Sequence, residues 1–376
     1  MLRRARKNNS QAVVIATGCY AQIAAAEILS LADVDLVVGN NQRTKIVQLA
    51  EQFAKDQQKR AVVENSAGFK HFEELPMERM IERTRAYLKV QDGCEQFCTY
   101  CIIPYARGPL RSRSLESTLA EAKKLEEAGF KELILTGIHL GAYGQEQPEQ
   151  QLNITALCRK ILQETSIARL RLGSIEPMEV TDELIALIAS THRMCRHLHL
   201  PLQSGHDDIL AQMHRPYRTD DYRQKLLEIR RSIPDIAIST DLMVGFPGEN
   251  DDHFRKCLAF CDEMAFSNMH IFKYSPRTGT PAAEYAQQID AAVKDSRSKR
   301  MADVAAKNST LFMQRFVGQQ MLVLCEEQDK YGLWTGHTDN YLKVSFTGEA
   351  TRGDLVWVSL ERIGKKELIG SKIEQN

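Results

Sequence analysis

The sequence YLKVQDGCEQFCTYC, residues 87–101, places a short apolar strand directly before a loop that contains three cysteines. Cys94, Cys98 and Cys101 follow the spacing C-x3-C-x2-C, and three thiolates converging from one loop are typical of a soft-metal site. Zinc and iron–sulfur cubanes usually take four protein ligands. If the metal is a 4Fe–4S cluster, one iron therefore stays open to bind a substrate or cofactor. The alternative is a structural zinc, or three thiols buried as small hydrophobic side chains.

Around this loop, strand-like apolar runs alternate with helical stretches. The strand-like runs cover residues 87–90, 132–137, 168–173, 196–201, 236–245 and 268–275. Helical periodicity is clearest in residues 115–130, 219–233 and 249–266. Six strands alternating with helices predict a parallel barrel or a doubly wound sheet. Polar, glycine-containing loops after the strands favour a barrel with its site at their carboxyl ends.

The flanking segments have different patterns. Residues 1–65 read as strand, helix, strand, helix, with strands at 12–17 and 34–39, which is typical of α/β structure. This segment opens abruptly, so we expect the front of the domain to be missing. Residues 66–84 lack a clear period and are interpreted as a linker. The alternating region spans 85–313, and the short β runs at 320–327, 331–338, 341–346 and 354–363 predict a small all-β barrel over residues 314–376.

Composition excludes several classes of protein. The 376 residues are 43% hydrophobic and 26% charged, which is ordinary for a globular chain of two or three domains. Lys+Arg and Asp+Glu balance at 49 each, so any basic surface must be local. No apolar run approaches the roughly 18 residues that span a bilayer, and the start has no secretory core. We therefore expect a cytoplasmic protein without a membrane partner, whose nine cysteines are thiols or metal ligands.

Several motifs, in order, resemble the radical S-adenosylmethionine (SAM) methylthiotransferases. They are DGCEQFCTYCIIPYARGPLRSR (92–113), LTGIHLGAYG (135–144), HLHLPLQSG (197–205), STDLMVGFPGE (239–249) and YSPRTGTPAAEY (274–285). GCYAQ (18–22) resembles the family's N-terminal domain, and the C-terminal β segment resembles its TRAM domain. The resemblance implies an α/β fold: a partial (βα)6 radical-SAM barrel, preceded by a truncated α/β methylthiotransferase domain and followed by a TRAM-like barrel that binds RNA.

The resemblance also implies an activity. RGPLRSR (107–113), LTGIHLGAYG and GHTDNYLKV (336–344) most resemble the branch that modifies tRNA. Its reaction is radical-based methylthiolation of C2 of N6-threonylcarbamoyladenosine next to the anticodon, with SAM as radical source and methyl donor. The implied partners are a tRNA anticodon loop and a reducing electron donor of the flavodoxin or ferredoxin type. The alternatives are a branch acting on isopentenyladenosine tRNA or a ribosomal protein, and an inactive RNA-binding remnant lacking the auxiliary cluster.

The family's site residues carry over onto matching positions. Cys94, Cys98 and Cys101 would hold the 4Fe–4S cluster that binds SAM. Candidate cofactor contacts at strand ends are Gly137, Ser174, Gln203, Gly245 and Glu249, each of which could instead be a turn residue without a ligand. Arg111, with Arg107 and Arg113, is interpreted as a partner for a cofactor carboxylate or a tRNA phosphate rather than a solvated patch.

Cys19 in GCYAQ matches the last of three cysteines that hold the family's second 4Fe–4S cluster. The other two would lie upstream of Met1, which is why we expect a truncated N-terminus and why sulfur insertion by this chain is an open question. Elsewhere, His253, Cys257 and Cys261 share one helix face at i, i+4 and i+8, which can form a metal site but is more typical of a buried face. The remaining cysteines have apolar neighbours and are interpreted as core: Cys158, Cys195 and Cys325.

RNA binding is expected from local features. Basic residues exceed acidic ones between Arg79 and Arg113, and the helix at 291–316 adds five more, an excess that can follow phosphates. In the C-terminal segment, a stacking and hydrogen-bonding surface for an unpaired base is expected from Trp334, His337, Asn340 and Tyr341. The alternative is a barrel-core aromatic with polar turn residues.

Overall fold

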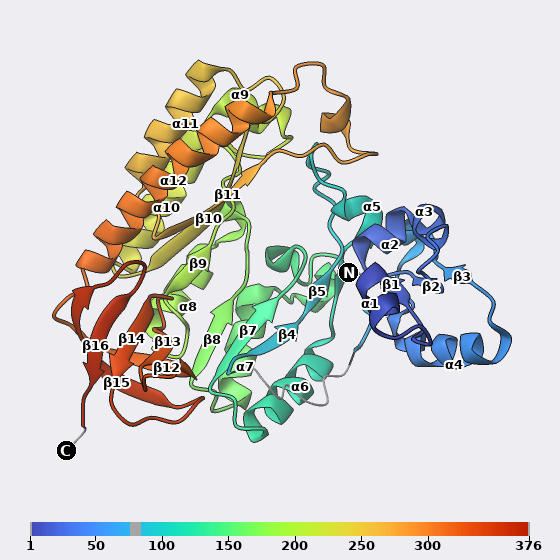
Figure 1. Cartoon of the computed structure of the whole chain (residues 1–376). Coiled ribbons are helices and arrows are strands. Elements are labelled where there is room, and N and C mark those ends of the chain that lie inside the picture. Colours follow the sequence, from blue (N-terminus) through green and yellow to red (C-terminus); the bar gives the residue numbers. More distant parts are fainter. Residues whose placement is uncertain (1, 76–83, 375–376) are drawn as a thin grey trace.

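The computed structural model describes residues 2–75 and 84–374 of the chain (Figure 1). Three units follow one another: a small α/β unit, a large α/β core and a closed β-barrel. Residues 76–83 of the predicted linker 66–84 lie outside the described residues. In the described part of the chain, no helix is long and apolar enough to cross a membrane.

The N-terminal unit contains a three-stranded parallel sheet of order β1-β2-β3. Its strands are β1 (Ile15–Thr17), β2 (Leu36–Val38) and β3 (Arg60–Val62), and its helices are α1 (Leu2–Asn8), α2 (Cys19–Ile23), α3 (Ala25–Leu29) and α4 (Ile46–Asp56). The two strands predicted from sequence are present, but β3 was missed. It is a three-residue edge strand of which no residue is fully buried, so it lacks the apolar run that marks the central strand β2.

All six strands predicted for the core are present. They are β4 (Ala86–Lys89), β7 (Glu132–Thr136), β8 (Arg169–Leu172), β9 (His197–His199), β10 (Ala237–Val244) and β11 (Asn268–Lys273). They form two parallel three-stranded sheets, β4-β7-β8 and β9-β10-β11. Parallel bridges between Leu170 and Met194 and between Ser174 and His199 connect the two sheets. The order along the combined sheet therefore follows the order along the chain.

Helices cover one face of these strands (Figure 1). The helices of the core are α5 (Ile103–Arg107), α6 (Leu115–Glu127), α7 (Ile154–Glu164), α8 (Asp182–Ser190), α9 (Asp207–Gln212), α10 (Thr219–Ser232), α11 (Asp251–Met264) and α12 (Ala291–Gln314). A two-residue antiparallel pair, β5 (Gln91–Asp92) with β6 (Arg111–Ser112), flanks the cysteine loop. Single 3-10 turns lie at Arg43–Lys45, Ser66–Gly68, Leu140–Ala142, Pro148–Gln150, Pro177–Glu179 and Pro281–Glu284.

Strand β10 shows that the two faces of the core strands differ in polarity. Ile238 and Leu242 are buried in the large hydrophobic cluster between strands and helices. Because side chains alternate along a strand, Ser239 and Asp241 point to the opposite face. We call that opposite face of the six strands the inner face. It carries polar side chains, and the cysteine loop lies at its carboxyl-terminal edge.

The C-terminal unit is the small all-β barrel that the sequence predicted. Its strands are β12 (Gln320–Gln328), β13 (Trp334–His337), β14 (Lys343–Thr347), β15 (Leu355–Ile363) and β16 (Leu368–Lys372), closed in the order β12-β13-β14-β16-β15. The fifth strand was not predicted, because LIGSK contains a glycine and only two apolar residues.

The C-terminal barrel packs against the amino ends of the core strands. Arg169, at the start of β8, donates to the carbonyl of Leu322 at 2.6 Å, and Arg171 donates to that of Asp339 at 2.9 Å. Both arginines also face the fully buried carboxylate of Glu132, at the start of β7. This joint therefore lies at the end of the strands opposite to the cysteine loop.

Candidate metal centre and cofactor site

The cysteine loop begins in a tight turn directly after β5. Gly93 has φ +79°, and a Cβ at this position would lie 1.7 Å from the carbonyl oxygen of Pro109. The backbone N–H of Cys94 donates to the carbonyl of Gly108 at 3.1 Å. Only glycine permits this close approach of the two segments, so the backbone itself fixes where the loop leaves the strand.

Cys98 is the buried thiol of the three. Its Sγ accepts a hydrogen bond from Nη1 of Arg215 at 3.4 Å. Arg215 is itself buried and ion-paired with Glu176, and its Nη2 donates to the hydroxyl of Tyr217 at 3.0 Å. A fixed positive charge therefore faces the sulfur of Cys98 from the segment that follows α9.

Cys94 faces a histidine on the loop after β7. Its Sγ lies 3.8 Å from Nδ1 of His139, and Nε2 of His139 lies 2.8 Å from Oε1 of Glu179. Burial opposes the charge on His139, but the hydrogen bonds and charges of Cys94 and Glu179 outweigh it and raise the pKa of His139 to about 10. Neither His139 nor Arg215 was predicted as a site residue, because nothing local in their sequence marks them.

The three thiols can supply three ligands to a metal cluster. Burial, together with the nearby Cys98 and Cys94, raises the pKa of Cys101 to about 11 against a hydrogen bond from the backbone of Ile103. A structural zinc usually takes four protein ligands, whereas three thiolates on a 4Fe–4S cluster leave one iron open for a cofactor. The three-thiol set therefore fits a cluster that binds a cofactor.

Three of the predicted cofactor contacts lie at strand ends beside this loop. Ser174 is exposed just past β8, so its hydroxyl is open to a ligand. Gln203 is half-buried and has φ +66°, with its N–H bonded to the carbonyl of Asp241 at 2.9 Å. Gly137 packs tightly, because a Cβ there would lie 2.9 Å from that of Gln91. Ser174 and Gln203 therefore keep free polar groups, whereas Gly137 is explained by packing.

Gly245 and Glu249 are engaged within the protein. The Glu249 carboxylate is buried, and its Oε2 accepts from the N–H of Gly245 at 2.7 Å and from Nη1 of Arg297 at 2.8 Å. Burial raises the pKa of Glu249 despite these partners. Its carboxylate thus closes the turn after β10 and ties it to α12, and direct cofactor contact by Glu249 stays a prediction.

The three arginines after the loop are also engaged. Arg111 is buried and donates to the carbonyl oxygens of Arg107 and Pro109 at 2.9 and 2.8 Å. Arg113 pairs with carboxylates of the neighbouring segments, and Arg107 lies 3.3 Å from Asp92. Each of these guanidinium groups is therefore engaged within the protein and holds the loop in shape, and anion binding by Arg111 stays a prediction.

Cys19 lies at the contact between the N-terminal unit and the cysteine loop. It begins α2, which packs against α5 directly after the loop. Nε of Arg107 donates to the Sγ of Cys19 at 3.2 Å. The fold therefore places this thiol beside the element that closes the three-cysteine loop, 75 positions apart in sequence from Cys94.

A sequence model of the radical SAM superfamily matches residues 88–261, from the first core strand into α11. Over 370 residues the chain is 37% identical to the threonylcarbamoyladenosine tRNA methylthiotransferase MtaB of Bacillus subtilis, a match spanning 97% of this chain and 82% of that protein. The chain belongs to the radical SAM methylthiotransferases. It is therefore an enzyme of this family, whose cofactors are a 4Fe–4S cluster and SAM.

Other methylthiotransferases match at similar identity. MtaB of Thermotoga maritima is 33% identical over 100% of this chain and 84% of its own length. The tRNA-2-methylthio-N(6)-dimethylallyladenosine synthase of Erythrobacter litoralis is 35% identical over 98% of this chain and 83% of its own length. The chain therefore matches relatives of both branches over more than four-fifths of their length.

Only some of the four residues expected to form an RNA-binding surface on the C-terminal barrel of the methylthiotransferase are accessible. Trp334 is buried in the barrel core, so its prediction as a stacking residue is wrong. Asn340 is also buried. Tyr341 remains 39% exposed, with its ring 4.8 Å from that of His197 and 4.9 Å from that of His337. The exposed aromatic side chain is therefore Tyr341, packed between the buried His197 and the half-buried His337, rather than Trp334.

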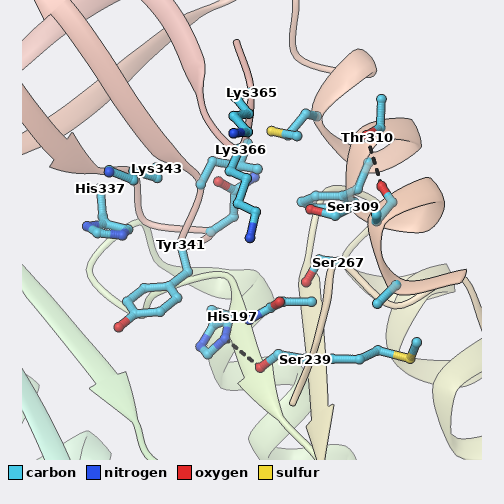
Figure 2. Close-up of a pocket in the computed structure, with 18 of the residues that line it drawn as sticks. His197, Ser239, Ser267, Ser309, Thr310, His337, Tyr341, Lys343, Lys365 and Lys366 are labelled. Carbon is cyan, nitrogen blue, oxygen red and sulfur yellow. Dashed lines mark hydrogen bonds between the residues drawn. The ribbon is translucent and has the colours of Figure 1, made fainter. Parts of the chain in front are cut away.

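A cavity of about 470 Å³ adjoins Tyr341 (Figure 2). Its walls come from the C-terminal barrel, α12 and the strands β9 to β11. Lys343, Lys365 and Lys366 line it together with Tyr341. Most other basic residues predicted to follow phosphates are paired with carboxylates or carbonyl oxygens, and Arg79 and Arg83 lie outside the described residues. Lys343 is itself 3.4 Å from the carboxylate of Glu367, so Lys365 and Lys366 are the more available basic side chains of this cavity.

The other cysteines are structural, as predicted. Cys257 and Cys261 are buried on α11, and the Sγ of Cys257 accepts from the N–H of Gly205 at 3.1 Å. His253 turns away from them and stacks on His206, with ring centroids 4.5 Å apart. Burial also confirms the interpretation of the remaining three as core: Cys158, Cys195 and Cys325.

Proposed function

We propose that this methylthiotransferase modifies tRNA, converting N6-threonylcarbamoyladenosine next to the anticodon to its 2-methylthio form, with SAM as radical source and methyl donor. The observation that carries the proposal is the three-cysteine loop at the carboxyl edge of the core strands, in a chain 37% identical to a threonylcarbamoyladenosine tRNA methylthiotransferase. In this proposal the core is a partial (βα)6 barrel over 85–313, and 314–376 is a TRAM-like RNA-binding barrel.

In this proposal the loop cysteines hold the cluster, and residues around the loop exclude water and orient SAM. Cys94, Cys98 and Cys101 would hold the cluster and leave one iron for the amino and carboxylate groups of SAM. When bound, the cluster supplies the electron that cleaves the sulfonium and so starts hydrogen removal from C2 of the adenine. Arg215 donates to Cys98 and keeps that side of the loop closed to water. Ser174 and Gln203 offer the free polar groups that orient the cofactor on the inner face.

Sulfur insertion would involve Cys19. In the family a second 4Fe–4S cluster carries the sulfur, and Cys19 is the one match to its ligands in this sequence. Its contact with Arg107 supports the assignment, because the thiol lies beside the helix that closes the first loop. A second cluster held there would lie at the contact between the N-terminal unit and the cysteine loop. The reductant would be a flavodoxin- or ferredoxin-type protein.

Contact with tRNA would use the C-terminal barrel. Lys343, Lys365 and Lys366 line one cavity with Tyr341 at its edge. Lysines beside the exposed edge of an aromatic ring suit contact with a phosphate backbone and its sugars. Because the barrel lies at the amino ends of the core strands and the cysteine loop at their carboxyl ends, the bound tRNA would extend along the core from one end to the other.

Anaerobic reconstitution tests the cluster assignment. The reconstituted protein should bind one 4Fe–4S cluster at the loop and form 5′-deoxyadenosine from SAM when dithionite is added. Cys98→Ala should abolish both. Cys158→Ala is the matched control, because this cysteine is fully buried away from the loop in α7. Cofactor cleavage that survives in Cys98→Ala would refute the ligand assignment.

Substrate choice is tested with defined RNAs. The protein is incubated with tRNA carrying threonylcarbamoyladenosine, tRNA carrying isopentenyladenosine, or the ribosomal protein substrate of the third branch, and products are identified by mass spectrometry. We expect methylthiolation of the first RNA alone. Product on either other substrate and none on the first would overturn the proposal while leaving family membership intact.

A further inference from the structure

Three metal-binding side chains outside the cysteine loop meet on the inner face, next to Ser174 and Gln203. His199 ends β9, Asp241 lies within β10, and His270 lies within β11. The register explains their meeting, because Asp241 pairs with His270 and His199 pairs with Ser239, two positions before Asp241. Neighbouring residues on one face of paired strands project side by side. One ligand atom from each of the three side chains lies within 4.8 Å of the others.

The spacing of the first two ligands suits a tetrahedral metal. Nε2 of His199 lies 3.3 Å from Oδ2 of Asp241. Metal bonds of about 2.0–2.1 Å at tetrahedral angles separate two ligand atoms by roughly 3.3 Å. His270 is exposed, its ring centroid lies 5.6 Å from that of His199, and one of its ring nitrogens lies within 4.8 Å of both other ligand atoms, so it can supply a third ligand. Two histidines and a carboxylate leave at least one position open.

A neighbouring hydroxyl fixes the orientation of the first ligand. Nδ1 of His199 lies 2.9 Å from Oγ of Ser239, so this nitrogen is occupied and Nε2 is left to face Asp241. The same hydroxyl contacts Nε2 of the buried His197 at 3.0 Å. A serine hydroxyl can both donate and accept, so it can serve both rings. Such support of the second ring nitrogen is typical of metal-bound histidines.

A similar group elsewhere is less suited. Among the described residues, His206, Asp208 and His253 also bring ligand atoms within 4.8 Å. There, however, the rings of His206 and His253 stack, and His253 is part of the cap of α11 through Asn250. The side chain of Asp208 is also 69% exposed, against 28% for Asp241. Each group has one exposed member, which is His270 on the inner face and Asp208 in the other group. The ligands on the inner face have fewer other roles.

We propose that His199, Asp241 and His270 form a second metal site of the enzyme, on the inner face, for a divalent transition metal such as Zn²⁺. Two imidazoles and one carboxylate suit zinc, iron, cobalt or nickel rather than the all-oxygen ligand sets of Mg²⁺ and Ca²⁺. The site shares no ligand with the cysteine loop. It does not depend on which substrate the enzyme modifies.

Zinc binding tests the site in the full-length holoenzyme. Anaerobically reconstituted protein, whose loop cysteines are occupied, is dialysed against chelator-buffered Zn²⁺ and its zinc is measured by elemental analysis. We expect one zinc per chain. Asp241→Asn, which keeps the side-chain shape, and His199→Ala should each weaken binding at least 100-fold, and Ser239→Ala by about 10–100-fold, the usual effect of losing such a supporting partner.

His253→Ala is the matched control, because it removes a histidine of the other group. It should leave the zinc content unchanged. A second measurement uses Co²⁺ with a Cys94→Ala, Cys98→Ala, Cys101→Ala protein, where a visible d–d band without sulfur-to-cobalt charge transfer is expected. Thermal melting verifies that each variant is folded. The proposal is overturned if folded parent protein takes up no zinc, if Asp241→Asn binds it as tightly as the parent, or if His253→Ala removes it.

Discussion

The guanidinium of Arg215 lies 3.4 Å from the sulfur of Cys98, although the two residues are 117 positions apart in sequence. Arg215 is buried and ion-paired with Glu176, so water does not screen its charge. Hydrogen bonds and charge near the sulfurs set the potential of an iron–sulfur cluster. Arg215 therefore couples the stability of the core to the electronic environment of one cluster ligand.

Replacing Arg215 should lower the free energy of unfolding strongly unless its ion-pair partner Glu176 is replaced too. Arg215→Met leaves the Glu176 carboxylate without its partner, and breaking a buried pair in this way costs about 3–5 kcal/mol. The double variant with Glu176→Gln should recover most of that loss. It should still lower the reduction potential of the reconstituted cluster, because the donor to Cys98 is gone. Urea unfolding and potentiometric titration followed by EPR measure the two effects.

Equal stability of the single and double variants would contradict a coupled pair. An unchanged potential in the double variant would show that Arg215 has no influence on the cluster. Lys123→Ala serves as a control for loss of a surface pair, since Lys123 and Glu164 are both about half exposed. Exposed pairs contribute about 0–1 kcal/mol.

Gly93 and Gly129 form a matched pair for testing the turn that starts the cysteine loop. Both have positive φ, +79° and +89°. A Cβ at Gly93 would meet the Pro109 carbonyl oxygen at 1.7 Å, whereas a Cβ at Gly129 meets nothing within 4 Å. Gly93→Ala should therefore displace the loop and lose cluster iron after reconstitution. Gly129→Ala should cost only about 1 kcal/mol of backbone strain and keep its iron. Full iron content in Gly93→Ala would contradict the steric argument.

The sequence predicted features that are local. The six core strands are short apolar runs separated by helices, and the cysteine loop is a contiguous motif, so both could be located without a structure. The strands β3 and β16 were missed because each is short and carries few apolar residues. Burial of Trp334 depends on closure of the barrel, which the local pattern of turn residues does not reveal.

Features that depend on contacts between distant parts of the chain could not be predicted from the sequence. Arg107 and Arg111 look like free cations in the sequence, but folding pairs them with Asp92 and with loop carbonyl oxygens. Likewise, His199, Asp241 and His270 belong to three motifs, and only the register of β9, β10 and β11 brings them together. Spacing along the chain carries no information about either arrangement.

Glu132 should make the joint with the C-terminal barrel sensitive to acid. Burial opposes its charge, but Arg171, Arg169 and Arg85 outweigh it and lower the pKa of Glu132 below its usual 4.5. A carboxylate whose pKa is lowered by folding stabilises the protein above its unfolded pKa, and this contribution is lost as pH falls. Glu132→Gln should therefore be less stable by about 3–5 kcal/mol near neutral pH. The difference should shrink below about pH 4.5 and vanish below the folded pKa.

Urea unfolding of both proteins across a pH series measures this difference. Glu183→Gln is a suitable control, because its side chain is 66% exposed and its contact with Arg159 is 3.6 Å long. A destabilisation of Glu132→Gln that stays constant from neutral to acidic pH would show that lost packing, rather than lost charge, is responsible.

Tyr341 should hold the C-terminal barrel against the core. Its backbone lies in the left-handed region at φ +65°, and its ring sits between the rings of His197 and His337. The Arg171 guanidinium lies 4.6 Å from the ring centroid. Aromatic and cation–π contacts of this kind contribute about 0.5–2 kcal/mol each. Tyr341→Ala should therefore destabilise the joint by about 2 kcal/mol and speed amide exchange in β13 and β14.

Tyr331→Ala provides the comparison, because Tyr331 lies in the same barrel but is 82% exposed. It should leave amide exchange in β13 and β14 close to that of the parent protein. If the exposed edge of Tyr341 also contacts RNA, as proposed, Tyr341→Ala should weaken tRNA binding as well. Tyr341→Phe separates the two roles, because it keeps the ring and should preserve both exchange protection and tRNA affinity. Equal exchange in Tyr341→Ala and Tyr331→Ala would mean that the joint is held by the arginine–carbonyl hydrogen bonds alone.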